Sequence, residues 1–228
     1  MSSTTTPTVT NEEVEAILNQ FLEKINPALS SEIQSMGLDT WEKVCEDKCT
    51  IGKIKLLGIK AEVKAEAKVR DMTGLSSMQF QSVEVDSVDQ NENQIRGKGK
   101  LSVELSSNLK AKAKGSVKAS VSGLSESVSI SGDLKAKEVT GSGDLEFSLE
   151  LKEGITYLQL VELRNLKLKY KDMDVDIDGL GSPFKDFLNE VVDLFEDLYK
   201  TAVQDLASRE AEGPINKALQ DGLPYEVN

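Results

Sequence analysis

The residues best placed to do chemistry in this 228-residue chain are alternate aspartates that end in a glycine: Asp172, Asp174, Asp176, Asp178 and Gly179. The last three aspartates and the glycine match positions 1, 3, 5 and 6 of an EF-hand loop, whose oxygens converge on Ca²⁺. The twelfth position is Lys185, where that loop needs a bidentate glutamate. Apolar residues alternate with the aspartates, so the segment is more simply an edge strand with a charged outer face. We therefore predict no metal site.

Catalysis is disfavoured by the absence of one residue type. The chain has no histidine, which excludes serine-type triads, histidine-containing zinc sites and the commonest general base. Asp and Glu together number 39, so no particular carboxylate pair stands out from a solvated surface. We predict no catalytic residues, no enzymatic activity and no cofactor.

Two cysteines, Cys45 and Cys49, lie four residues apart. They either close a small disulfide loop in an oxidising compartment or remain two free thiols. A single closely spaced pair without histidine is a poor zinc site.

The net charge of −12 argues against nucleic acid as a partner, because phosphate binding relies on Lys and Arg. It argues equally against anionic membrane surfaces. A basic stripe at Lys110, Lys112, Lys114 and Lys118 has the spacing typical of the solvated face of a strand.

No apolar run approaches the roughly 20 residues needed to cross a bilayer, so we predict no transmembrane segment. Residues 1–10, rich in Ser and Thr, are expected to form a flexible leader. Residues 11–228 are expected to form a single domain. The composition does not predict an oligomeric state.

The first part of the chain has the periodicity of an amphipathic helix. Between Asn11 and Met36 apolar residues recur every three or four positions, with Thr10 or Asn11 as the N-cap. Pro27 is expected to end or kink the helix, and a second short helical piece is expected to follow it.

The period then changes to two. One alternation covers Leu57 to Arg70, which at roughly 3.3 Å per residue gives a strand of about 43 Å. Others cover residues 101–121, 128–136, 145–151 and 158–170, and turns are expected near Gly123, near residues 141–143 and near Gly154. Consecutive long strands joined by short turns predict an antiparallel meander.

A second amphipathic helix is expected after Ser182 and Pro183, and Gly213 with Pro214 is expected to break or kink it. From Phe184 to Ala211 it would measure about 42 Å at 1.5 Å per residue, close to the strand length. The fold class is therefore α+β: a long, highly curved antiparallel sheet wrapped around a long C-terminal helix, with an N-terminal helix.

Short C-terminal motifs resemble a known family. Gly179-Leu180, Phe187-Leu188-Asn189-Glu190 and Leu223-Pro224-Tyr225 are similar to the takeout and juvenile hormone-binding proteins of arthropods. The general layout also resembles arthropod group 7 allergens, within the tubular lipid-binding superfamily that includes bactericidal permeability-increasing proteins. The cysteine pair departs from the takeout pattern, in which it lies nearer the N-terminus. The resemblance implies a super-roll with an apolar tunnel that carries fatty acids, terpenoids or other lipids, usually outside cells.

We therefore expect a secreted, non-enzymatic carrier of an elongated hydrophobic molecule held between the sheet and the C-terminal helix. The expected helix wall is Phe184, Phe187, Leu188, Val191, Leu194, Phe195 and Leu198. The expected sheet wall is Ala65, Ala67, Val69, Leu101, Val103 and Leu105. The alternative is a surface-active or structural amphipathic protein without a bound ligand.

Overall fold

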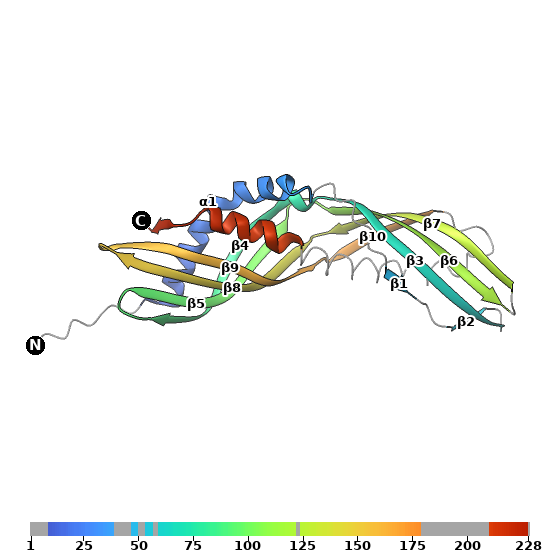
Figure 1. Ribbon diagram of the computed structural model, residues 1–228, viewed down its shortest axis with the longest axis horizontal. Coiled ribbons are helices and arrows are strands. Elements are labelled where there is room, and N and C mark those ends of the chain that lie inside the picture. The colour runs from blue at the N-terminus through green and yellow to red at the C-terminus, as the bar shows by residue number, and fades with distance from the viewer. Residues whose placement is uncertain are drawn as a thin grey trace, which may run out of the picture.

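The computed structural model describes residues 9–38, 47–49, 53–56, 59–121, 124–178 and 210–227. Two antiparallel sheets lie end to end along the long axis, and helices cover the sheet at one end (Figure 1). The α+β class, the N-terminal helix and the long antiparallel strands are as predicted. The single, highly curved sheet that was predicted is wrong, because the strands form two open sheets. Of the helix expected at 184–211, only residues 210 and 211 lie within the described residues, and both are helical.

Helix α1 (Asn11–Ser35) begins at a capping box. The Glu13 amide donates to the Thr10 hydroxyl at 3.2 Å, and the Thr10 amide donates to the Glu13 carboxylate at 2.9 Å. Pro27 lies inside the helix, so the predicted separate second piece is wrong. Figure 1 shows that α1 changes direction along its length, as expected where a proline removes one backbone hydrogen bond.

The six-stranded sheet has the order β1-β3-β6-β7-β10, with β2 also paired to β3. Its strands are β1 (Asp47–Cys49), β2 (Lys53–Leu56), β3 (Ile59–Thr73), β6 (Leu109–Val121), β7 (Leu124–Lys137) and β10 (Asp172–Asp178). The predicted strand of unusual length is confirmed, because β3 contains 15 residues.

The five-stranded sheet has the order β11-β9-β8-β5-β4. Its strands are β4 (Met78–Gln90), β5 (Gln94–Leu105), β8 (Thr140–Lys152), β9 (Ile155–Lys169) and β11 (Tyr225–Val227). The turn predicted at 141–143 is wrong, because these residues pair within β8. The turn at Gly154 is confirmed, and Gly123 lies outside the described residues.

Within the described residues, four connections between consecutive strands cross from one sheet to the other, in the middle of the molecule, which we call the waist. The crossings are η1 (Leu75–Ser77) between β3 and β4, residues 106–108, residues 138–139 and residues 170–171. Backbone hydrogen bonds join them: the Ser106 amide donates to the Ser77 carbonyl at 3.1 Å, and the Leu105 amide donates to the Val139 carbonyl at 2.9 Å. The alternation predicted over 101–121 is therefore two strands, β5 and β6, in different sheets.

The described part of the C-terminal helix covers residues 210–221. Gly213 and Pro214 lie within it, so the predicted break at this pair is wrong. Figure 1 shows this helix beside α1 over the five-stranded sheet. Neither α1 nor the described C-terminal turns are long and apolar enough to span a membrane.

Candidate functional site

The aspartate-rich segment forms β10, an edge strand of the six-stranded sheet. Asp172, Asp174 and Asp176 are exposed, while the intervening Met173 and Val175 are half-buried, so the edge-strand interpretation is confirmed. The hydrogen bond from Lys137 lowers the pKa of Asp174 below its usual range. No cluster of three acidic, cysteine or histidine side chains suited to a metal ion occurs in the described ranges.

The apolar face of the five-stranded sheet is covered and filled by large side chains. Phe21 and Leu18 from α1, Phe147 from β8 and Leu163 from β9 are all at most 2% exposed. Leu101, Val103 and Leu105, which we predicted to line a ligand site, belong to this packed core. Each buried large aliphatic side chain stabilises the fold by about 1.5–3 kcal/mol.

One edge of this sheet, strand β4, is covered by polar side chains of α1. The Asn26 amide group accepts a hydrogen bond from the Phe80 amide at 2.7 Å and donates to the Phe80 carbonyl at 3.1 Å. Asn19 accepts from the Val83 amide at 2.9 Å, and Glu15 accepts from the Val85 amide at 2.8 Å. The helix thus satisfies backbone groups that an edge strand otherwise leaves open.

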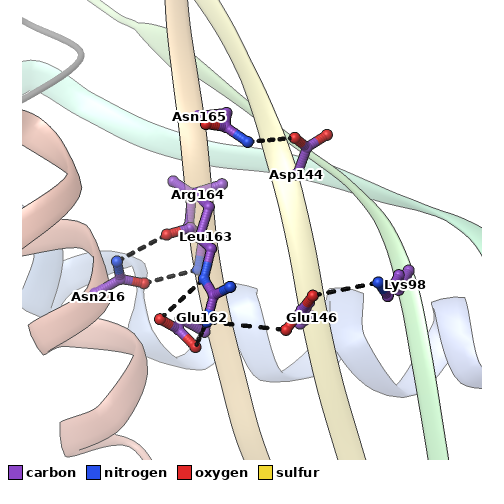
Figure 2. A network of polar contacts seen from close by, with 8 residues as sticks. All are labelled: Lys98, Asp144, Glu146, Glu162, Leu163, Arg164, Asn165 and Asn216. Atoms are coloured by element: carbon purple, nitrogen blue, oxygen red, sulfur yellow. Dashed lines mark hydrogen bonds and ion pairs between the residues drawn. The ribbon is translucent and has the colours of Figure 1, made fainter.

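On the opposite side of the sheet β11 pairs only with residues 156–158 of β9, and the C-terminal helix covers the backbone of β9 farther along that strand. Asn216 accepts a hydrogen bond from the Leu163 amide at 2.7 Å and donates to the Leu163 carbonyl at 2.9 Å (Figure 2). Glu212 accepts a hydrogen bond from the Leu166 amide at 2.7 Å. The sequence analysis missed these polar residues. The signal in the sequence is an Asn or Glu next to the apolar stripe of an amphipathic helix, as Asn216 is next to Ile215.

Helix α1 also contacts strand β11 and the C-terminal helix at this end of the molecule. The rings of Phe21 in α1 and Tyr225 in β11 lie 5.5 Å apart, and the Lys24 ammonium lies 4.8 Å from the centre of the Tyr225 ring. Lys217 and Glu32 form an ion pair at 3.1 Å. The five-stranded sheet and its helices therefore form a closed, packed unit.

The six-stranded sheet aligns several small residues in backbone register. Near the waist, Leu109, Ala111, Leu134 and Ala136 are buried. Farther along the strands, backbone register aligns Ala67 with Gly115 and Ile130 in one row, and Val69 with Ala113 and Gly132 in the next. Two of the three residues in each of these rows are Ala or Gly, whereas the core of the other sheet contains Phe and many Leu residues.

The predicted sheet wall does not lie on one sheet. Ala65, Ala67 and Val69 occupy alternate positions of β3 in the six-stranded sheet, whereas Leu101, Val103 and Leu105 lie on β5 in the other sheet. Cys49 pairs in register with Ala65. Cys45 and the seven predicted helix-wall residues, Phe184 to Leu198, lie outside the described residues.

The outer face of the five-stranded sheet carries a chain of paired charges (Figure 2). Lys98 and Glu146 lie 3.4 Å apart, and Arg164 contacts Glu162 at 3.0 Å and Glu146 at 4.0 Å. Nearby, Asp144 accepts hydrogen bonds from Lys100 and Asn165, which lower the pKa of its carboxyl. These exposed pairs neutralise one another and stabilise the fold only modestly.

Together these features define a class of protein: an elongated α+β molecule of two antiparallel sheets, with helices packed on the sheet at one end and Ala and Gly aligned in backbone register in the sheet at the other.

No family model matches the chain, and no curated protein matches its sequence. Among solved structures, the chain is similar to a lipopolysaccharide binding protein, with 18% identity over 92% of this chain and a TM-score of 0.38. It is also similar to Takeout 1 of Epiphyas postvittana, with 12% identity over 91% of this chain and 87% of that chain, and a TM-score of 0.34. The chain spans 39% of the length of the lipopolysaccharide binding protein.

Proposed function

We propose that this protein is a non-enzymatic carrier that holds an elongated hydrophobic molecule, such as a fatty acid or a terpenoid, against the apolar face of the six-stranded sheet. The observation that carries the proposal is the contrast between the two sheets. Phe21, Phe147 and many leucines fill the five-stranded end, so that end leaves no room for a ligand.

The small residues of the six-stranded sheet support the location of the ligand. An element that covers rows of Ala and Gly, such as Ala67 with Gly115, leaves space beneath it. An empty apolar cavity is destabilising, so either the cover approaches closely or a ligand fills the space.

Chain connectivity supports the identity of the cover. Strand β10 ends at Asp178, and the described C-terminal turns resume at residue 210, near the waist end of β9. The residues between them carry the apolar stripe that begins at Phe184 and Phe187. In this proposal the stripe and β3 residues Ala65, Ala67 and Val69 face the ligand, while Leu101, Val103 and Leu105 form the closed end of the tunnel.

Binding energy in such a site comes mainly from buried apolar area, at about 25 cal/mol per Å². No catalytic group is needed for a carrier, and the proposal keeps the extracellular location that the family resemblance implies.

Native mass spectrometry of protein purified without detergent, with analysis of its organic extract, tests the proposal. We expect a co-purifying lipid, or saturable binding of a fluorescent fatty acid that terpenoids displace. Ala67→Leu should weaken fatty acid binding at least about tenfold by filling the space, since extra methylenes in a packed site force strain. Lys112→Leu, at an exposed position of β6, is the control and should leave affinity unchanged. An empty protein that binds neither ligand class, yet lowers surface tension strongly, would support the surface-active alternative instead.

A further inference from the structure

A groove of about 710 Å³ crosses the polar face of the five-stranded sheet, on the side away from the packed core. Residues from β4, β5, β8 and β9 line it. Its volume lies in the range of about 300–1,000 Å³ that is common for small-molecule sites. The groove is separate from the apolar face that we propose for the carried molecule.

Three residues of the groove form one row across the sheet. Arg96 of β5 pairs in register with Ser148 of β8, and Ser148 pairs with Leu160 of β9. Neighbouring strands lie about 4.8 Å apart, so the backbones of Arg96 and Leu160 are separated by about 10 Å. The short side chain of Ser148 between them, only 7% exposed, leaves the depression.

Arg96 supplies a positive charge that is not held in an ion pair within the described residues, although the Asp89 carboxylate also lines the groove. Its Nε donates to Gln94 at 3.1 Å. Asp89 lies opposite Arg96 in the register, yet no carboxylate in the described part of the chain forms an ion pair with this guanidinium. The neighbouring cation Lys98, by contrast, is paired with Glu146. Arg96 therefore retains donors in the fork geometry that binds carboxylate, sulfate or phosphate groups.

Leu160 supplies an apolar surface at the other end of the row. It is 41% exposed on a face that otherwise carries mainly charged and hydroxyl side chains. An exposed leucine alone is ordinary. Here it lies across a hollow from an unpaired arginine, and the two ends of the row favour opposite ends of one amphiphile.

We propose that this groove binds a small anionic amphiphile, with its anionic group on Arg96 and its short apolar body lying over Ser148 against Leu160. The site differs in chemistry from the proposed carrier site, since it needs a charged head group and takes only a short apolar part. It does not depend on the carrier function.

Octyl sulfate, used below its micelle concentration with the full chain, is a suitable probe. We expect saturable binding by calorimetry, with amide NMR shifts concentrated at Gly97, Ser148 and Leu160. Arg96→Gln should weaken binding at least about tenfold, because a charge-assisted hydrogen bond is lost. Leu160→Ser should weaken it several-fold, and uncharged octyl glucoside should bind much less tightly than octyl sulfate.

Lys169→Gln is the matched control, because it removes the same charge from a separate hollow on the same sheet face. Equal losses for Arg96→Gln and Lys169→Gln would overturn the proposal in favour of general charge attraction. Binding to vesicles that contain phosphatidylglycerol, without binding of monomeric octyl sulfate, would also overturn it, because the surface would then recognise a membrane. Unchanged thermal unfolding of each variant shows that the fold is retained.

Discussion

At the scale of single residues, Gly97 and Gly213 differ in the space that surrounds their Cα atoms. A Cβ on Gly97 would lie 2.3 Å from Phe147 Cζ and 2.6 Å from the Ser87 carbonyl oxygen. A Cβ on Gly213, within the C-terminal helix, would meet no described atom within 4 Å apart from its chain neighbours and the backbone of its own helix. The absence of a side chain thus permits close packing at Gly97 and has no such role at Gly213.

This contrast predicts effects of different size for one substitution. Gly97→Ala should lower the free energy of unfolding by about 1–3 kcal/mol, because the core ring and the β4 backbone must both move. Gly213→Ala should change it by less than about 1 kcal/mol, because the higher helix propensity of alanine is opposed by contact of its Cβ with the ring of Pro214. Urea unfolding of the two variants beside the parent protein measures both. Destabilisation of similar size at the two positions would contradict this explanation.

At the scale of elements, each long helix acts as a cover for a strand edge as well as for a sheet face. Asn19 and Asn26 of α1 together make three hydrogen bonds to the β4 backbone. Without them, β4 would present free backbone groups to other chains, which is the usual route to edge-to-edge association.

We therefore predict two changes, in stability and in association, for the double variant Asn19→Ala, Asn26→Ala. The free energy of unfolding should fall by about 2–4 kcal/mol, at about 1 kcal/mol or more for each backbone group left unpaired. Sedimentation velocity should also show dimers or larger species. Gln20→Ala, at an exposed position of the same helix, should change neither quantity. A double variant that is destabilised but remains as monomeric as the parent would show that these residues do not protect the edge.

The elements also explain what sequence patterns predict and what they miss. Long strands are predictable because alternation is local, and β3 follows its pattern. The division of 101–121 is not predictable, because Leu105, Ser107 and Leu109 keep the same parity through the crossing at the waist. Strand β4 gives no continuous period, since its register shifts twice, at Phe80/Ser82 and at Val85/Ser87.

The site residues divide in the same way. The small size of Ala65, Ala67 and Val69 is visible in the sequence, but their separation from Leu101 depends on which strands pair. The row of Arg96, Ser148 and Leu160 joins three strands through register, so no local pattern contains it.

At the scale of the whole molecule, the two sheets are joined by the chain crossings at the waist but differ in the residues that they contain. At one end, helices cover the backbones of β4 and β9, and large side chains fill the core. The other has Ala and Gly in adjacent rows. In the proposed function the ligand binds at this second end. The packed core that stabilises the fold and the ligand site then lie at opposite ends of the long axis.

Hydrogen exchange with and without a bound fatty acid tests this separation. Backbone amides open by local unfolding, so a ligand that packs on one sheet slows exchange mainly there. We expect slower exchange in Ala111–Lys114 of β6 and Leu134–Ala136 of β7, with little change in β4 or β5, which the core already protects. Octyl sulfate should instead act only near Arg96 and Ser148. Protection by the fatty acid that is confined to β5 and β8 would contradict the proposed carrier site, because it would place the ligand in the five-stranded half. That half would then have to open its packed core around Phe21 and Phe147 to admit a ligand.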